Sequence, residues 1–297
     1  MCNRRGGDEV EKQLQACLQK RCIEYVTNAS MRTFQKSRLK TSLMEKRKAE
    51  IVHVKAKGKI IKQVRSLEGI TLDYKVHVQY LIKQEDLFYI EEEIEYRSAL
   101  FKQYELIKDE EVSYTEQKEE QVKEIEVETG GRMPFTYDRT KAVQYAERWW
   151  NERNPAYPEF ENNCTHYISQ CLRAGGAPMR GAPNRSKGWW FSGKSWSYSW
   201  SVANALYLYL KDSTVGLRTK ELSSPEELML GDIICYDFEG DGKFNHNTIV
   251  TAKDRNGMPL VNANTTDSRL RYWSYEDSTA YTSNIQYRFF HIVDDYS

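Results

Sequence analysis

Residues 160–172, which read FENNCTHYISQCL, decide how the second half of this chain folds. Asn162 or Asn163 is a natural N-cap, because a short polar side chain can accept hydrogen bonds from the free amides of a first helical turn. The apolar residues that follow recur at helical spacing, and the glycines at 175–176 end the helix. The pattern therefore predicts a helix whose first turn carries Cys164.

A cysteine at this position is chemically suited to act as a nucleophile. The free amides and the positive end of the helix dipole favour an anion there. A thiol has a reference pKa of about 8.5, and a helix N-terminus together with a cationic partner lowers it. The same amides can stabilise a tetrahedral oxyanion. The alternative is that Cys164 is a plain core residue.

Five histidines could supply the base that such a cysteine needs, and His246 is the best placed. We expect strands over residues 233–236 and 248–252, joined by a glycine-rich turn, with His246 at the mouth of the second strand. An imidazole there could face a helix N-terminus that packs on the sheet; the alternative is an ordinary loop histidine. His166 lies two residues after the cysteine, a spacing that points helical side chains to different faces. His291 sits in a predicted closing strand and is expected to be structural.

A third polar group should orient the imidazole of such a pair. After a turn at residues 255–259, a strand over residues 260–264 is expected to pair antiparallel with the strand that carries His246. This pairing would bring Asn264 or Asn262 beside the ring. An asparagine amide can accept a hydrogen bond from one ring nitrogen while the other nitrogen stays available.

The first 130 residues have a different pattern. Apolar residues recur at helical spacing over residues 8–48, which predicts one or two amphipathic helices. From residues 50 to 112 the period shifts to two, which predicts an antiparallel sheet with one wet face. We expect a small α+β domain over residues 1–130, for which a cystatin-like arrangement is one alternative, with a charged linker over residues 113–135 at its end. It carries no cluster of potential catalytic groups. A second domain follows over residues 136–297.

The composition gives few hints of partners. The 297 residues include 43 basic and 43 acidic ones, so neither nucleic acid nor an anionic membrane is indicated as a partner. The Lys/Arg-rich stretch over residues 36–48 is expected to be a solvated face.

No apolar run is long enough for a transmembrane helix, and no signal peptide is recognised. We therefore expect a cytoplasmic protein, or a cell-envelope or secreted one if the true start is missing. The six cysteines form no disulfide or metal pattern, so reduced thiols are expected.

Six of the seven tryptophans lie between residues 149 and 200. Such a group could wall a substrate groove, although aromatic residues more often fill a core. The candidates for substrate contact are Trp189, Trp190, Trp196 and Trp200.

Residues 237–242 read DFEGDG, which is similar to the start of an EF-hand calcium loop. The twelfth position counted from Asp237 is Thr248 rather than Glu, and no flanking helix pair is evident. We therefore favour a plain acidic turn over a calcium site, and expect no metal or other cofactor.

Several short motifs occur together between about residues 136 and 293. They are Tyr137-Asp138-Arg139 with Trp149-Trp150, Asn154-Pro155-Ala156-Tyr157, Asn163-Cys164-Thr165 with the residues that follow to 176, Trp189-Trp190, Ser197-Tyr198-Ser199-Trp200, and Gly231-Asp232. Together with the order of cysteine, histidine and polar residue, this set resembles the NlpC-type branch of the papain-like superfamily. It resembles the bacterial putative amidase domain family more closely still.

The resemblance implies a papain-like, NlpC-like domain in which the helix bearing the cysteine packs on an antiparallel sheet. It implies cysteine-dependent hydrolysis of amide or peptide bonds, in substrates such as peptidoglycan stem peptides, by Cys164, His246 and Asn264. The chain departs from the family pattern, because Asn163 and Asn245 stand where Asp is usual and Asn264 stands where His is common. The alternative is a catalytically weakened module that binds wall peptides or a protein partner. In a further hypothesis, the first domain docks over the cleft as an interaction or inhibitory module.

Overall fold

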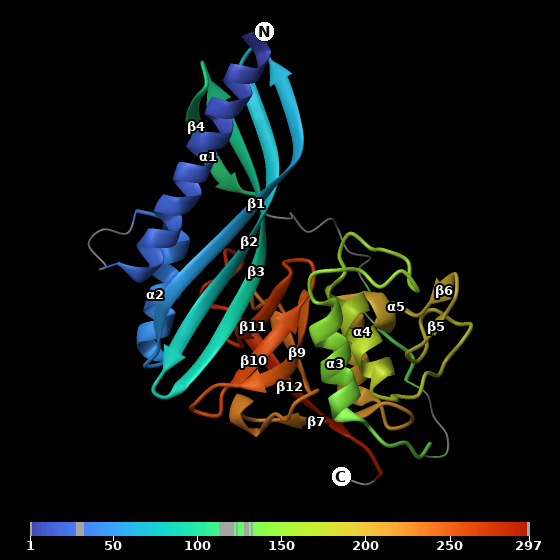
Figure 1. Ribbon diagram of the computed structural model, residues 1–297. Helices are drawn as coiled ribbons and strands as arrows, with labels where there is room; N and C mark the ends of the chain where they lie inside the picture. The colour runs from blue at the N-terminus through green and yellow to red at the C-terminus, as the bar shows by residue number, and fades with distance from the viewer. Residues whose placement is uncertain are drawn as a thin grey trace. The chain divides into compact units, whose positions relative to one another are not determined.

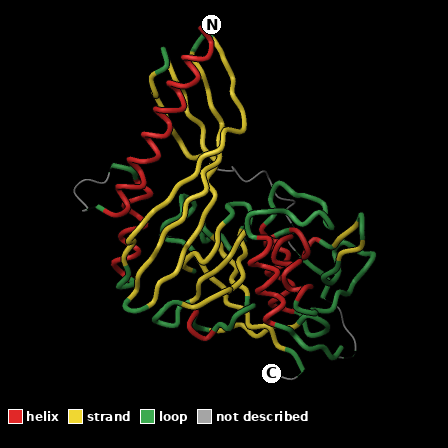
Figure 2. The backbone as a smooth tube through the Cα atoms, in the orientation of Figure 1, coloured by secondary structure: helices red, strands yellow, loops and turns green. Residues whose placement is uncertain are grey.

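The computed structural model describes residues 2–27, 33–112, 122, 124–127, 131 and 133–295, with side chains from residue 9 onwards. Within these residues the fold is α+β, with antiparallel sheet and several helices (Figure 1 and Figure 2). The chain divides into two compact units. Unit 1 comprises Met1–Tyr114 and Glu276–Thr279, and unit 2 comprises Thr115–Tyr275 and Ala280–Ser297. Most of the predicted linker over residues 113–135 lies outside the described residues.

Unit 1 combines helices with an antiparallel meander in which each strand pairs with the next. Its elements are α1 (Cys2–Val26), α2 (Gln35–Lys46), β1 (Glu50–Ser66), β2 (Gly69–Gln84), β3 (Leu87–Lys102) and β4 (Glu105–Glu111). Leu72, Tyr74 and Val76 are buried while the residues between them are half-buried, because successive side chains of a strand point to opposite faces. The prediction of helices followed by long antiparallel strands is confirmed.

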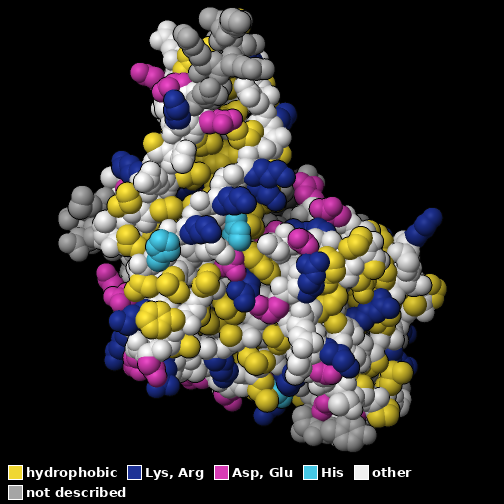
Figure 3. Space-filling view, in the orientation of Figure 1, with side chains coloured by type: hydrophobic (Ala, Val, Ile, Leu, Met, Phe, Trp, Pro, Cys, Tyr) yellow, Lys and Arg dark blue, Asp and Glu magenta, His cyan; other side chains and the backbone are white. Residues whose placement is uncertain are grey.

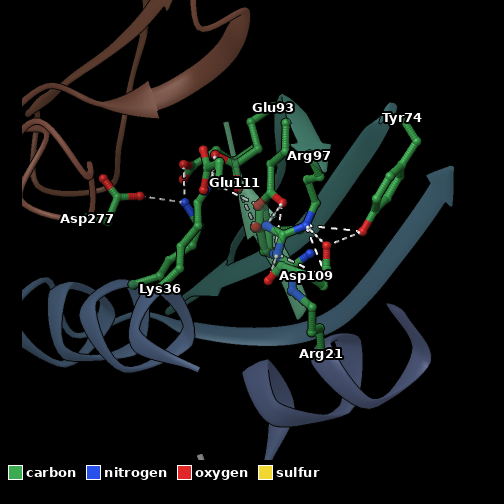
Figure 4. Close-up of polar contacts among 12 residues, drawn as sticks. Arg21, Lys36, Tyr74, Glu93, Arg97, Asp109, Glu111 and Asp277 are labelled. Carbon is green, nitrogen blue, oxygen red and sulfur yellow. Dashed lines mark hydrogen bonds and ion pairs between the residues drawn. The ribbon is translucent and has the colours of Figure 1, made fainter. Parts of the chain in front are cut away.

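A network of buried charges holds the helices of unit 1 to its strands (Figure 4). The carboxylate of Glu95 lies 2.8 Å from Lys36 Nζ and 2.8 Å from Arg21 Nη2. Arg97 bridges this carboxylate, at 3.2 Å, to that of Asp109, at 3.0 Å. These cations keep the pKa of Glu95 below its usual range despite the burial of its side chain. The expectation that residues 36–48 form a solvated face is therefore wrong for Lys36.

The short segment Glu276–Thr279 belongs to unit 1 through ion pairs with α2. Lys40 is 1% exposed, and its ammonium group pairs with both Glu91 and Asp277, the latter at 2.9 Å. Lys46 pairs with Glu276. A second lysine of the supposedly solvated stretch is thus buried, because carboxylates of distant segments satisfy its charge.

Unit 2 is an antiparallel sheet with helices, in strand order β11-β10-β9-β8-β12-β7. Its helices are α3 (Arg139–Trp149), α4 (Cys164–Ala174), α5 (Tyr198–Ser201), α6 (Ala203–Asp212) and a 3₁₀ turn at Pro225–Glu227. Its strands are β5 (Phe191–Ser192), β6 (Ser195–Trp196), β7 (Arg218–Leu222), β8 (Ile233–Asp237), β9 (His246–Lys253), β10 (Pro259–Ala263), β11 (Ser268–Tyr272) and β12 (Gln286–Val293). The predicted elements are confirmed, with β9 starting two residues earlier than expected.

The sheet of unit 2 separates two apolar cores. Cys235 of β8 and Ile249 of β9 belong to the core on one face of the sheet, together with residues of α4 such as Cys171. Tyr236 and Val250 belong to the core on the other face. This alternation decides which residues of β8 and β9 lie toward α4.

The two helices nearest the site begin differently. Asp138 caps α3 and accepts a hydrogen bond from the amide of Lys141 at 3.0 Å. Asn163 holds the N-cap position of α4, but its side chain makes no capping bond. At the other end Gly176 has a φ of +93°, a conformation that glycine adopts at little cost and that ends the helix.

Both signs of charge are interspersed on the face seen in Figure 3, with Lys and Arg side chains gathered over β1 and β2. Lys55, Lys57 and Lys59 are exposed on β1, which lies at the edge of its sheet. Lysines on an edge strand discourage pairing with another chain. Among the described residues, no helix has both the length and the apolar character needed to cross a bilayer.

Candidate active site

Cys164 is the first residue of α4 and its side chain is buried, with 3% of the residue exposed. Its Sγ lies 3.7 Å from the hydroxyl of Thr165. The backbone amides of Asn163 and Cys164 both donate to the hydroxyl oxygen of Thr265, at 2.8 and 3.0 Å. The amide expected to stabilise an oxyanion therefore has an internal partner, which an oxyanion would have to replace.

The side chain of Asn264 fixes the start of α4. Its Oδ1 accepts a hydrogen bond from Asn163 Nδ2 at 2.8 Å, and its Nδ2 donates to the carbonyl of Trp150. Asn264 was expected beside the His246 ring, and the structure gives it these partners instead. The reason is the strand register, since Asn262 pairs with Ile249. β10 ends at Ala263, and this register continued by two residues would set Asn264 opposite Asn247 rather than His246.

His246 is the first residue of β9 and is 8% exposed. It pairs with Tyr236, on the face opposite to Cys235. Its Nε2 lies 3.3 Å from the hydroxyl of Tyr275, and its ring packs among those of Tyr236 and Phe238. Burial, aided by the positive charge of Arg271, lowers the pKa of His246 to about 3, so the ring is neutral near pH 7.

A direct hydrogen bond pins the first turn of α4 to the start of β9. Asn247 Nδ2 donates to Thr165 Oγ1 at 2.9 Å, and both residues are fully buried. The candidate nucleophile and the candidate base each neighbour one member of this bond in the chain. The start of α4 and the start of β9 are thus brought together. Among the described residues, however, the hydrogen-bond partner of the His246 ring is Tyr275 and not Cys164.

The unpaired amide oxygens beside Cys164 mark the polar side of the site. Within the described residues, Asn163 Oδ1 and Asn247 Oδ1 are buried without a hydrogen-bond partner. Asn163, Asn264 and Gln170 line a cavity of about 10 Å³, which has room for about one water molecule. Neither Cys164 nor His246 lines this cavity, which lies behind the first turn of α4.

His166 belongs to the aromatic core rather than to the candidate catalytic pair. Its Nδ1 accepts a hydrogen bond from Trp200 Nε1 at 2.7 Å, and its ring lies edge-on to Phe160. The residue is 1% exposed, and burial lowers the pKa of the ring to about 4. His166 is therefore a neutral core residue at neutral pH.

Three of the four tryptophans considered for substrate contact are buried. Trp189 and Trp200 are 0% exposed and Trp190 is 2% exposed. Trp189 Nε1 donates to Ser169 on α4 at 2.9 Å, which ties it into the core. The burial favours core packing for these three. Trp196 is half-buried, with its ring against Phe160, and remains the candidate for substrate contact.

The acidic run after β8 forms a turn. Asp237 accepts hydrogen bonds from the backbone amides of Gly240 and Gly242, both at 2.7 Å. The carboxylate thus organises the loop that leads to His246. In the part of the chain that the structure describes, no group of three or more His, Cys, Asp or Glu residues is arranged to hold a metal ion.

A larger groove of about 720 Å³ lies within unit 1, between α1 and β1. Leu14, Leu18, Val54 and Ala56 contribute its apolar lining. None of the described residues that line it is a histidine, so it offers no cysteine–histidine pair.

Sequence patterns gave no reason to single out Asn247, Thr265, Arg271 or Tyr275. Asn247 was detectable only as the neighbour of His246 in the chain. Thr265 and Tyr275 lie outside the strands, at turns where no periodicity applies, and tertiary folding alone brings them to the site.

Comparison with known proteins places the second unit in a family. The model of the family described as "Putative amidase domain" matches residues 136–290. The uncharacterized protein YhbB of Bacillus subtilis (strain 168) is 55% identical over 273 residues, which cover 86% of this chain and 85% of that protein. A second uncharacterized protein of that organism, YjcM, is 29% identical over 126 residues, or 39% of this chain and 28% of that protein.

No solved structure matches this chain. The papain-like, NlpC-like and cystatin-like comparisons therefore stay predictions. The family match covers both Cys164 and His246, and more than half of the chain. This chain belongs to the putative amidase domain family.

Proposed function

We propose that this chain hydrolyses amide bonds in cell-wall peptides, with Cys164 as nucleophile and His246 as its base. Membership of the amidase domain family supports amide hydrolysis in general. The observation that carries the cysteine mechanism is the position of Cys164 at the first turn of α4, pinned to the start of β9 through Thr165 and Asn247.

In the proposed reaction, His246 takes the proton of the Cys164 thiol, and the thiolate attacks the amide carbonyl carbon. The tetrahedral intermediate collapses to a thioester as the amine leaves with the proton from His246. Water, deprotonated by His246, then attacks the thioester, releases the acid and restores the thiol. The backbone amide of Cys164, which donates to the Thr265 hydroxyl in this structure, is the proposed hydrogen-bond donor to the oxyanion.

The His246 ring lies on the face of the sheet opposite to Cys235 and the core with α4, so catalysis in this form requires the start of β9 to turn the ring toward Cys164 when substrate binds. Catalytic hydrogen bonds are often long or poorly aligned without substrate and tighten in the reacting complex. Asn264 supports the chemistry by holding Asn163 and hence the first turn of α4.

A second candidate function is peptide binding without cleavage. It is favoured by the partner that Thr265 already provides for the Cys164 amide, and by the bond of the His246 ring to Tyr275. Departures from the family pattern at Asn163, Asn245 and Asn264 point the same way.

Incubation of the purified chain with synthetic wall stem peptides, followed by mass spectrometry of the products, separates the two candidates. Hydrolysis should be lost in Cys164→Ala and retained in Cys171→Ala, a matched change of a buried cysteine two turns along the same helix. Turnover that survives Cys164→Ala would refute the cysteine mechanism. Saturable binding of the peptides with no cleavage by the unmodified chain would favour the binding module.

A further inference from the structure

Among the described residues, the hydrogen-bond partner of the His246 ring is a tyrosine. Tyr275 Oη lies 3.3 Å from His246 Nε2, and the centroids of the two rings are 5.4 Å apart. Phe238 and Tyr236 pack around the imidazole through their rings. The hydroxyl of Tyr236 is engaged elsewhere, with Thr248 Oγ1 at 3.1 Å. The hydrogen bond between Tyr275 and Nε2 is therefore the contact through which the protein can orient the ring.

Tyr275 is itself held firmly from two sides. Its hydroxyl lies 3.4 Å from Ser268 Oγ, and the guanidinium carbon of Arg271 lies 4.3 Å from the centroid of its ring. The residue is 2% exposed and has a φ of +57°, a left-handed conformation that a bulky residue adopts only where its surroundings enforce it. Such a backbone fixes the direction of the side chain.

Three polar groups thus stand in a row: the imidazole Nε2, the Tyr275 hydroxyl and the Ser268 hydroxyl. A hydroxyl donates one hydrogen and accepts others. If Tyr275 donates to Ser268, its oxygen is left to accept from Nε2–H. The imidazole is then the tautomer that carries its hydrogen on Nε2 and a lone pair on Nδ1.

We propose that Tyr275, through Ser268, is the positioning residue of His246, and that it holds the ring in the tautomer whose Nδ1 can accept a proton. Asn264, expected from sequence for this role, is instead engaged with Asn163 and Trp150. The inference rests on the proposed function for its consequence in catalysis, while the tautomer itself is independent of any reaction.

The charged and titratable groups around the His246 ring favour its neutral form in the absence of substrate. Arg271 is the charged side chain whose field acts on His246, and Tyr275 and Tyr236 are the titratable neighbours. A cation nearby opposes protonation of the ring. The imidazole is therefore neutral at rest, and accepting the proton of the thiol requires the ring to leave this buried position beside Arg271.

The test compares Tyr275→Phe with Tyr236→Phe, a matched loss of one buried hydroxyl from a ring that also packs on His246. The ¹⁵N chemical shifts of the His246 ring, assigned with His246→Gln, report the tautomer directly. We expect the Nε2–H tautomer in the unmodified chain and in Tyr236→Phe, and a shift toward a mixture in Tyr275→Phe. Ser268→Ala, which removes the acceptor for the tyrosine hydrogen, should shift the tautomer in the same direction.

Activity provides the second readout. We expect kcat on stem peptides to fall about 10-fold or more in Tyr275→Phe with KM little changed, and to stay within about 2-fold in Tyr236→Phe. An unchanged tautomer in both Tyr275→Phe and Ser268→Ala would overturn the proposal, as would a gain of activity in Tyr275→Phe. If Tyr275→Phe fails to fold, Ser268→Ala decides the question. Turnover surviving Cys164→Ala would refute the proposed function and leave the tautomer result standing.

Discussion

Replacement of Thr265 by valine should destabilise unit 2, because the Thr265 hydroxyl is the acceptor for two amides at the start of α4. The change preserves the shape of the side chain and its β-branching. Any strain from the φ of +82° at this residue is therefore common to both forms. What is lost is the acceptor for the amides of Asn163 and Cys164, at 2.8 and 3.0 Å.

The size of the effect follows from the two orphaned donors. A buried donor left without a partner costs about 1–3 kcal/mol. Thr265 is half-buried, so water can partly replace the hydroxyl, and we take about 1 kcal/mol for each amide. The total of about 2 kcal/mol corresponds to a fall in Tm of about 4–8 °C for a unit of this size.

Tryptophan fluorescence is a selective assay for this prediction, since all seven tryptophans lie in unit 2. Thermal unfolding followed by fluorescence should show the lower Tm for Thr265→Val. The control is Thr265→Ser, which keeps a hydroxyl acceptor and should lose less than half as much. Equal loss in the two variants would refute the assignment of the effect to the hydroxyl.

Three further predictions follow from buried contacts. Asn247→Ala removes the donor to Thr165 and should lower the stability of unit 2 by about 1–2 kcal/mol in a fluorescence-detected denaturant titration; an unchanged midpoint would contradict the link between α4 and β9. His166 is neutral in the folded chain, with a pKa of about 4 against 6.5 when unfolded, so its contribution is present above pH 6.5 and is lost as pH falls toward 4. His166→Asn should reduce this acid-induced loss by up to about 3 kcal/mol, and identical pH profiles of stability would refute the shift. Lys36→Met removes an ammonium group that Glu95 shares with Arg21 and Arg97 and that also pairs with Glu93, and should destabilise unit 1 by about 3–5 kcal/mol, measured by amide hydrogen exchange in β3; unchanged protection would count against the buried network.

The local elements around the site were predictable because their signals are local. A helix beginning at Cys164 follows from an asparagine N-cap, an apolar stripe and two glycines, and α4 has these bounds. The strand expected over residues 248–252, with His246 at its mouth, lies within β9, which begins at His246 itself. These patterns depend on neighbours within a few residues, which the sequence contains directly.

The face on which each residue lies depends instead on register, which is a tertiary property. The spacing suggested that Asn264 or Asn262 would lie beside His246, but Asn262 pairs with Ile249 and Asn264 hydrogen-bonds Asn163 and Trp150. A shift of one residue in register reverses the face of every side chain in a strand. No single-sequence pattern specifies that register.

Burial of charge and of aromatic residues was equally hard to predict. The sequence around Lys40 is typical of an exposed lysine. In the structure Lys40 is buried, because Glu91 and Asp277, which are far away in the chain, balance its charge. Trp189 and Trp200 could have lined a groove, yet Ser169 and His166 satisfy their indole N–H groups inside the core. In each case the deciding partner comes from another element.

The central claim is that Cys164 is a nucleophile activated by His246, and its alkylation rate tests this most directly. Iodoacetamide labelling at pH 7, mapped by peptide mass spectrometry, compares Cys164 with Cys171 and Cys235, whose pKa values are raised by burial. The account predicts that Cys164 is alkylated fastest, and that His246→Gln slows it about 10-fold or more. A Cys164 that reacts no faster than Cys235, or whose rate is indifferent to His246, would contradict the account.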